Sequence, residues 1–214
     1  MKAVKTMTIS SGKIDIYCLD RELLFANSED IAAFFGELVY DAYPEFYSLI
    51  PLPKTVVALY LAELIGQRGG ELEYTYSLRM DGRDRGIISI LPAREVKSAM
   101  TRGALAIMRK LYHPHIEKFA AHLQNFRLGI EPLHATGNYI ARLSVAASAR
   151  RMGIGMAAVK WAIARNANEN LTVHAHRDNA PVIDLYRKLG FEFISKENFL
   201  MRAMIHGSQI QPNS

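Results

Sequence analysis

The chain has 214 residues, a formal net charge of +5 and a hydrophobic content of 50%. This length suits one well-buried domain, and the composition is typical of a globular protein and excludes a disordered one. The single cysteine, Cys18, excludes an internal disulfide and fits a reducing compartment.

Residues 13–19 alternate in the manner of a strand, so we expect Cys18 to be a small packed residue rather than a nucleophile. Asn27 is a candidate N-cap, with Asp30 three residues later, for a helix whose apolar face continues to Val39.

A second helix is predicted from the apolar stripe of residues 56–64, and the glycines of residues 67–70 end it. Strands at 72–80 and 86–92 then flank Asp81-Gly82, a sequence that favours a tight hairpin turn.

Residues 94–127 predict a helical hairpin with a break at His113-Pro114-His115. This segment holds seven basic and two acidic residues, so it carries the whole net charge of the protein. It therefore forms either a solvated helix face or a local site for an anionic partner, and it argues against general nucleic-acid binding. The spacing of His113, His115 and His122 favours a solvated face over a metal site.

The remaining elements complete an α/β (α+β) single domain over 1–206, followed by a frayed tail at 207–214. They are strands at 138–145, 171–176, 191–195 and 199–205 and helices at 153–167 and 180–189.

The stretch 149-ARRMGIGMAAVKWA-162 places two arginines and two glycines at the start of a helix. Helix N-termini carry unpaired amides and partial positive charge, and glycine allows an anion to approach the backbone closely, so the pattern indicates a phosphate-binding turn. The Gly-Lys-Ser/Thr of a P-loop is absent. A Rossmann pattern matches formally as Gly153-x-Gly155-x-x-Ala158, but the chain lacks the acidic residue expected at the end of the next strand.

The run 145-VAASARRMGIGMAAV-159 resembles the acyl-CoA-binding motif of the GNAT superfamily of N-acyltransferases, whose Arg/Gln-x-x-Gly-x-Gly/Ala core corresponds here to Arg150, Gly153 and Gly155. A second family motif is matched by 179-NAPVIDLYRKLGF-191, and the two together are far more specific than either alone. The resemblance covers residues 138–195. It implies the GNAT fold, a central mixed, mostly antiparallel sheet flanked by helices, with the helical hairpin as an insertion between the third and fourth predicted strands.

This chain departs from the family pattern at a few positions. Ala147 replaces the usual proline, Arg151 replaces the glycine that commonly follows the first arginine, and Pro181-Val182 stands where small residues are frequent. None of these departures removes a backbone donor from the turn, and Arg151 adds a cation beside it.

The resemblance implies direct transfer of an acetyl group from acetyl-CoA, or another acyl group from its CoA thioester, to a primary amine, without a metal. In the family the two strands beside the motif splay apart, and the pantetheine arm lies between them. The implied coenzyme-binding residues are Leu143, Ser144, Val145, Arg150, Arg151, Met152, Gly153, Ile154, Gly155, Met156, Asn179 and Tyr186.

Tyr186 matches the tyrosine that protonates the departing thiolate in many relatives. A phenol suits this role because it is protonated at neutral pH. An amide near Val145 would stabilise the developing negative charge. The glutamate that relatives often carry on the strand is absent from 138–145, where Arg142 stands. His174, His134, Glu131 and a water chain all remain candidate bases.

Neither the first residues nor the apolar runs predict a signal peptide or a membrane span, so we expect a cytoplasmic protein. The acceptor amine is unassigned, and the basic hairpin favours an acidic or phosphorylated one. Homodimerisation stays open. A non-catalytic acyl-CoA sensor on the same fold is the alternative function, and a nucleotide-binding oxidoreductase is a more distant one.

Overall fold

The computed structural model describes residues 3–22, 24, 28–127, 136–197 and 200–206. Its strands are Lys5–Ile9 (β1), Gly12–Cys18 (β2), Thr75–Met80 (β3), Arg83–Pro92 (β4), Asn138–Val145 (β5), Leu171–His176 (β6), Glu192–Glu197 (β7) and Leu200–Ile205 (β8). They form one sheet in the order β1-β2-β3-β4-β5-β6-β8-β7. Neighbouring strands are antiparallel except β5 and β6, which are parallel.

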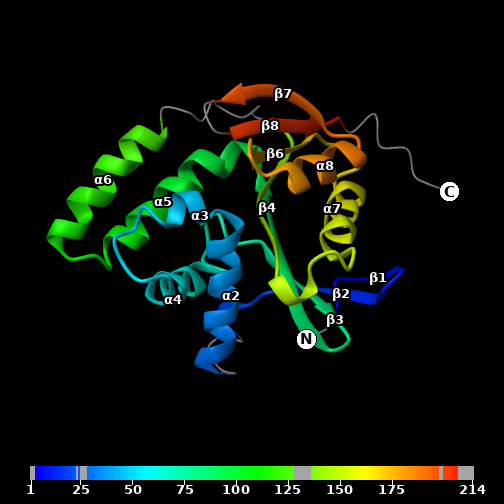
Figure 1. The fold of residues 1–214 in the computed structure, drawn as a ribbon, viewed down its shortest axis with the longest axis horizontal. Helices are drawn as coiled ribbons and strands as arrows, with labels where there is room; N and C mark the ends of the chain where they lie inside the picture. The colour runs from blue at the N-terminus through cyan, green and yellow to red at the C-terminus, as the bar shows by residue number, and fades with distance from the viewer. Residues whose placement is uncertain (1–2, 23, 25–27, 128–135, 198–199, 207–214) are drawn as a thin grey trace.

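Helices cover both faces of this sheet. They are Glu29–Ala42 (α2), Pro44–Tyr47 (α3), Lys54–Leu64 (α4), Val96–Met108 (α5), His113–Arg127 (α6), Ile154–Arg165 (α7) and Ala180–Lys188 (α8). Figure 1 shows α2 to α6 on one side of the sheet and α7 and α8 on the other. The predicted α/β (α+β) fold with a mixed, mostly antiparallel sheet is confirmed.

Each face of the sheet has its own apolar core. On the α7 side, Trp161 is buried and packs edge-on against Tyr76 with ring centroids 4.8 Å apart, so it is a core residue. On the other side, Phe35 of α2 and Leu61 of α4 pack in one cluster with Ile87 of β4. Because both faces are covered, the central strands have few exposed positions.

Three local features differ from the sequence predictions. Strand β1 was not predicted, because its short polar-apolar alternation becomes a strand only by pairing with β2. Ser28 caps α2 by accepting from the Ile31 amide, and the predicted cap Asn27 lies outside the described residues. His113-Pro114-His115 does not separate the two helices but begins α6, because proline is tolerated in a first helical turn.

Cys18 is also not packed as expected. It is the last residue of β2 and is exposed, whereas Ile14 and Ile16 before it are fully buried. The predicted alternation therefore holds at Ile14 and Ile16 and does not extend to Cys18.

The turn between β3 and β4 forms as predicted, with Asp81 and Gly82 at φ 51° and 73°. Helices α5 and α6 lie between β4 and β5. These are the fourth and fifth strands, because β1 precedes the first predicted strand. That the two helices are an insertion, and that the domain spans 1–206, stay predictions. The tail 207–214 lies outside the described residues.

Candidate functional site

The parallel strands β5 and β6 separate at their carboxyl ends. They pair only between Asn138–Ile140 and Leu171–Val173, although β5 continues to Val145 and β6 to His176. Beyond the last pair, the edge of β5 that faces β6 has no neighbouring strand, whereas the other edge stays paired with β4. We call the space beside this free edge the gap. A ligand with its own hydrogen-bonding groups is therefore able to take the place of a strand there.

A β-bulge lies where the two strands part. The register between β4 and β5 passes from Ile90↔Ile140 to Ser89↔Arg142, which leaves Ala141 as an extra residue on β5. A bulge bends its strand and increases the local twist. Because this bulge follows the last β5–β6 pair directly, its bend directs the rest of β5 away from β6.

The direction of the β5 backbone groups follows from one hydrogen bond at the strand end. The Ala146 amide donates to the Arg85 carbonyl, on the side of β4. Alternate residues of a strand direct their N–H and C=O groups to opposite edges. Ser144 therefore faces β4, whereas Leu143 and Val145 direct their backbone groups into the gap.

The turn before α7 has the backbone conformation that the glycine motif predicts. Arg151 and Gly153 have φ of 64° and 83°, in the left-handed region. Gly153 is the N-cap of α7 and offers no side-chain cap, and the Ala157 amide is the first to bond back to it. The preceding amides of the helix, Ile154 to Met156, therefore have no acceptor within the helix. Arg150, four residues before the helix begins, is exposed.

The two motif glycines have different roles. Gly153 is needed for its positive φ, since a Cβ there would lie 3.5 Å from Ile9 and meet no severe clash. At Gly155 a Cβ would lie 3.8 Å or more from Val145 and Leu185, so packing within the protein does not require glycine. The bare backbone of Gly155 instead leaves room at the edge of the gap.

Two side chains hold this turn against the sheet. The Ser11 hydroxyl, in the turn between β1 and β2, donates to the Met152 carbonyl at 2.6 Å. Arg150 Nε donates to the Val145 carbonyl at 3.2 Å, which links the turn to the end of β5. Ser11 was missed from the sequence, because nothing local relates it to a motif far along the chain.

The second family motif forms helix α8. Asn179 caps this helix by accepting from the Val182 amide at 3.4 Å, and Pro181 lies in its first turn. Asn179 is therefore the N-cap of α8, and its predicted contact with a coenzyme stays a prediction.

Tyr186 points inward from α8 and is 2% exposed. Its ring packs against Phe191 with centroids 5.1 Å apart. Burial raises the pKa of the Tyr186 phenol above its usual value, and the nearby Tyr139 phenol of β5 raises it further. The residue is therefore protonated at neutral pH and lies close to the strand that borders the gap.

A tyrosine–histidine pair bridges β5 and β6 near the point where the two strands part. The Tyr139 hydroxyl of β5 and Nδ1 of His174 on β6 lie 3.1 Å apart. The structure thus places His174 at the mouth of the two separating strands. The other candidate bases, His134 and Glu131, lie outside the described residues.

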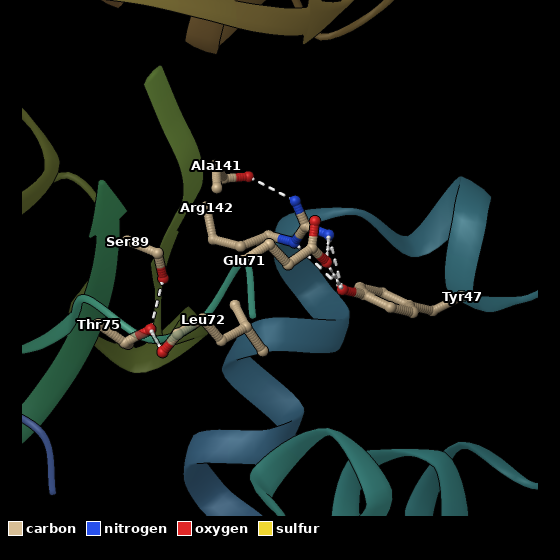
Figure 2. Close-up of polar contacts among 7 residues, drawn as sticks. All are labelled: Tyr47, Glu71, Leu72, Thr75, Ser89, Ala141 and Arg142. Atoms are coloured by element: carbon tan, nitrogen blue, oxygen red, sulfur yellow. Dashed lines mark hydrogen bonds and ion pairs between the residues drawn. The ribbon is translucent and has the colours of Figure 1, made fainter. Parts of the chain in front are cut away.

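Arg142 lies on β5, the strand in which the sequence has no carboxylate, and it is 5% exposed (Figure 2). Its Nη2 lies 2.6 Å from Glu71 Oε1 and 2.7 Å from the Tyr47 hydroxyl. Burial alone would lower the pKa of this guanidinium, but Glu71 and Tyr47 raise it above its usual range, so the side chain stays charged. Glu71 was missed, because no pattern in the sequence relates it to Arg142.

Only part of the charge on α5 and α6 is free to meet an anion. Lys110 is paired with Glu63 of α4, and Arg102 Nε donates to the Gly69 carbonyl. Lys97, Arg109 and Lys118 are exposed and have no ion-pair partner within the described part of the chain. Helix α5 packs through Val96 and Ala99 in a cluster that includes Tyr139 and Ala141, so it borders the gap.

His113 lies 3.7 Å from Glu117 on the exposed face of α6, and the His115 ring packs on Tyr112. Across the described ranges, no three His, Cys, Asp or Glu residues are grouped so that they could hold a metal ion. Within those same ranges, no helix combines the length and apolar character needed to cross a membrane.

The arrangement as a whole combines two binding features and one acid. The turn before α7 offers backbone amides and arginines to an anion. On its β6 side, β5 offers the backbone groups of Leu143 and the Val145 amide to an extended chain, whereas the Val145 carbonyl accepts from Arg150. The protonated Tyr186 phenol lies near Tyr139 of β5. An elongated anionic ligand therefore fits along β5 with its charged end at the turn.

Comparison with known proteins agrees with this geometry. The family described as the acetyltransferase (GNAT) family matches residues 40–191. The curated protein GCN5-related N-acetyltransferase 6, chloroplastic, of Arabidopsis thaliana is 41% identical over 64 residues, which cover 28% of this chain. The match spans only 22% of that relative's length.

Solved structures share the fold over most of the chain. An N-acetyltransferase from Staphylococcus aureus Mu50 superposes with a TM-score of 0.68 at 16% identity, covering 89% of this chain and 99% of that one. RimJ of Mycobacterium smegmatis, solved in complex with CoA-disulfide, superposes with a TM-score of 0.59 at 12% identity, covering 99% of this chain and 90% of that one.

Proposed function

Because the chain belongs to the acetyltransferase (GNAT) family, we propose that it transfers an acetyl group from acetyl-CoA to a primary amine. The observation that carries the proposal is the position of the turn before α7, with its unpaired helix amides, at the open end of the β5–β6 gap. One structural neighbour, the RimJ of Mycobacterium smegmatis, was solved with a CoA disulfide, which supports a coenzyme of this kind.

The pyrophosphate would be held by the amides from Arg151 to Met156, with Arg150 beside them. Two features support this assignment: the first amides of α7 have no acceptor in the helix, and Gly155 leaves space at the gap edge. Arg150 already donates to the Val145 carbonyl and so lies within reach of the turn. Donors fixed before the ligand arrives lower the cost of ordering on binding.

The pantetheine arm would pair with the backbone of β5. Leu143 and Val145 direct their backbone groups away from β4. Ser144 lies between them and would border the arm, while its own backbone groups face β4. The Val145 amide is the donor that we place on the thioester carbonyl oxygen, because a fixed backbone donor stabilises negative charge that develops there.

When bound, the thioester supplies the activated acyl group that the acceptor amine attacks. Tyr186 would hold the proton that the departing sulfur receives, and its raised pKa keeps that proton on the phenol at neutral pH. His174 is the candidate base among the described residues, held at the gap by its contact with Tyr139. A water chain remains the other route for the amine proton.

The acceptor would be an acidic or phosphorylated amine. Helix α5 borders the gap through Val96 and Ala99. Lys97, the second residue of this helix, is exposed. Arg102 does not serve this purpose, because it is committed to the Gly69 carbonyl. An acceptor with negative charge would thus be attracted to the mouth of the gap.

The test of coenzyme binding is thermal melting with acetyl-CoA, longer acyl-CoAs, CoA and NAD in parallel. A ligand at a hundred times its Kd adds about 2.7 kcal/mol of stability. For a domain of this size that corresponds to a rise in Tm of roughly 5–10 °C. A rise with the CoA compounds and none with NAD supports the proposal, and no rise with any CoA compound contradicts it.

A pair of glycine variants makes the test specific to the turn. Gly153→Ala and Gly82→Ala each place alanine at a similar positive φ without a severe clash, at the turn before α7 and at the β3–β4 hairpin. Both should lose about 1–2 kcal/mol of stability. Only Gly153→Ala should also lose most of the CoA-induced rise in Tm.

A further inference from the structure

We propose that Arg142 is a positioning residue that keeps β5 and β6 apart by capping the carbonyl of Ala141. The proposal rests on the proposed function in one respect: that the gap it maintains is the coenzyme site. It concerns a residue that the transfer reaction itself does not use.

Ala141 has no pairing partner in either of the strands that flank β5. It has no partner in β4, because it is the extra residue of the bulge, and none in β6, because that pairing ends at Ile140. Its carbonyl therefore lacks a strand partner at the point where the gap begins. Backbone carbonyls inside proteins are almost always paired, so this one requires a donor from elsewhere.

The donor is the side chain of the next residue. Arg142 Nη1 lies 2.6 Å from the Ala141 carbonyl oxygen (Figure 2). Without this bond, the nearest way to satisfy the carbonyl is to extend the parallel pairing with β6 by another residue. Because Arg142 already donates to the Ala141 carbonyl, further pairing of β5 with β6 would gain no hydrogen bond at that carbonyl.

The guanidinium is held in place from outside both strands. Its Nε and Nη2 donate to the Tyr47 hydroxyl of α3 at 3.2 and 2.7 Å, and Nη2 also lies 2.6 Å from Glu71 Oε1. The planar, multidentate head of arginine suits such fixed contacts better than lysine would. Because the anchors belong to α3 and the segment before β3, a movement of β6 does not carry Arg142 with it.

The segment that carries Glu71 is itself tied to the bulge. The Thr75 hydroxyl donates to the Leu72 carbonyl at 2.8 Å and lies 2.8 Å from the Ser89 hydroxyl (Figure 2). Ser89 is the β4 residue opposite Arg142. The chain of contacts therefore closes on itself, from the bulge through Arg142 and Glu71 back to the strand across from it.

A purely structural network and a positioning network predict opposite signs of one measurement. If Arg142 only stabilises the core, its removal loosens β5, and the amides of Leu143 and Val145 exchange with solvent faster. If it holds the gap open, its removal lets β6 pair further along β5, and the same amides exchange more slowly.

The experiment compares Arg142→Met with Arg79→Met by amide hydrogen exchange on the ligand-free full chain. Arg79 is a matched control, because it makes a two-pronged ion pair with Asp84 at 3.0 Å in the same sheet, between β3 and β4. In Arg142→Met we expect exchange at Leu143 and Val145 to slow by about tenfold or more. In Arg79→Met these amides should be unchanged.

Calorimetric titration with CoA gives the second readout. We expect Arg142→Met to weaken CoA binding by about tenfold or more, and Arg79→Met to leave the Kd within about twofold. If Arg142→Met does not fold, Tyr47→Phe decides, since it removes the acceptor of two guanidinium bonds and should shift both readouts in the same direction by less.

Faster or unchanged exchange at Leu143 and Val145 in a folded Arg142 variant would overturn the proposal. If the wild-type protein binds CoA, an unchanged CoA affinity in that variant would overturn it as well. Failure of the proposed function is recognised separately. If the wild-type protein does not bind CoA, the gap is not a coenzyme site, while the exchange result still decides the role of Arg142.

Discussion

The Ser11 hydroxyl donates to the Met152 carbonyl at 2.6 Å, across 141 positions of sequence. The bond joins the turn of the β1–β2 hairpin to the residue between the two left-handed positions of the turn before α7, Arg151 and Gly153. The N-terminal hairpin thus supports the conformation of the turn from a distance that no sequence motif spans.

We expect Ser11→Ala to weaken CoA binding by about 3- to 10-fold and to lower stability by about 1 kcal/mol, the usual value of one hydrogen bond. Ser10→Ala is the matched control in the same hairpin turn and should change neither quantity. Titration calorimetry and thermal melting measure the two effects. Equal CoA affinity for both variants would show that the turn holds its shape without the hairpin.

Arg151 is predicted to trade stability for binding. Its φ of 64° is unfavourable for a residue with a Cβ. Arg151→Gly should therefore raise the free energy of unfolding by about 1 kcal/mol and Tm by about 2–4 °C. CoA affinity should fall at the same time by about 3- to 10-fold at low salt, because a charged donor is lost.

Arg151→Lys keeps both the charge and the backbone strain, so it should leave Tm unchanged and CoA affinity close to that of the wild type. If Arg151→Gly gains stability without losing affinity, the guanidinium does not contact the coenzyme.

Tyr186→Phe separates catalysis from binding. Loss of the phenolic proton should lower kcat by about 10²-fold, since general acids contribute on that scale, with the Kd for CoA within about twofold of the wild type. Tyr76→Phe, at another buried tyrosine of the same core, is the control and should retain kcat. A parallel fall in affinity and rate would indicate a packing role instead, and an unchanged rate would exclude Tyr186 as the acid.

Stability should decline at alkaline pH. Burial raises the pKa values of Tyr43, Tyr47 and Tyr186 above the unfolded value near 10. Below about pH 10 both states keep these protons and the full stability is present. Above it only the unfolded chain releases them, so each tyrosine lowers the free energy of unfolding by about 1.4 kcal/mol per pH unit.

Thermal melting from about pH 8 to 11 measures this decline. Tyr186→Phe should reduce the slope by the share of one tyrosine. An equal slope in the wild type and this variant would contradict the burial effect.

The basic surface of α5 is predicted to select the acceptor. Lys97→Glu should lower kcat/KM for acidic or phosphorylated amines by about 5- to 10-fold at low salt, and by less at high salt because the interaction is screened. Lys118→Glu on α6 reverses another exposed charge and should have little effect. If neither variant changes acceptor preference, the charge on these helices serves solubility only.

Features that depend on neighbours in sequence were predictable. The positive φ at Gly153, the helix that follows it and the hairpin turn at Asp81-Gly82 are all set by local backbone chemistry. The two motifs also indicate the gap beside β5, through their resemblance to those of a family. By contrast, the start of α6 was predicted wrongly. The helix begins at His113, and Pro114 lies in its first turn. A proline is compatible with a first turn as well as with a break before a helix, so the sequence did not distinguish the two.

What the sequence by itself determined is the α/β architecture and the left-handed backbone of the turn before α7, because each is encoded by periodicity or by a short run of residues. The anion-binding role of that turn and the acid role of Tyr186 rest also on the family resemblance and stay predictions. Only the tertiary structure decided that Ser11 supports the turn and that Glu71 and Tyr47 fix Arg142 beside the bulge. These contacts join residues far apart in the chain, and their partners depend on how strands and helices pack, which no local pattern specifies.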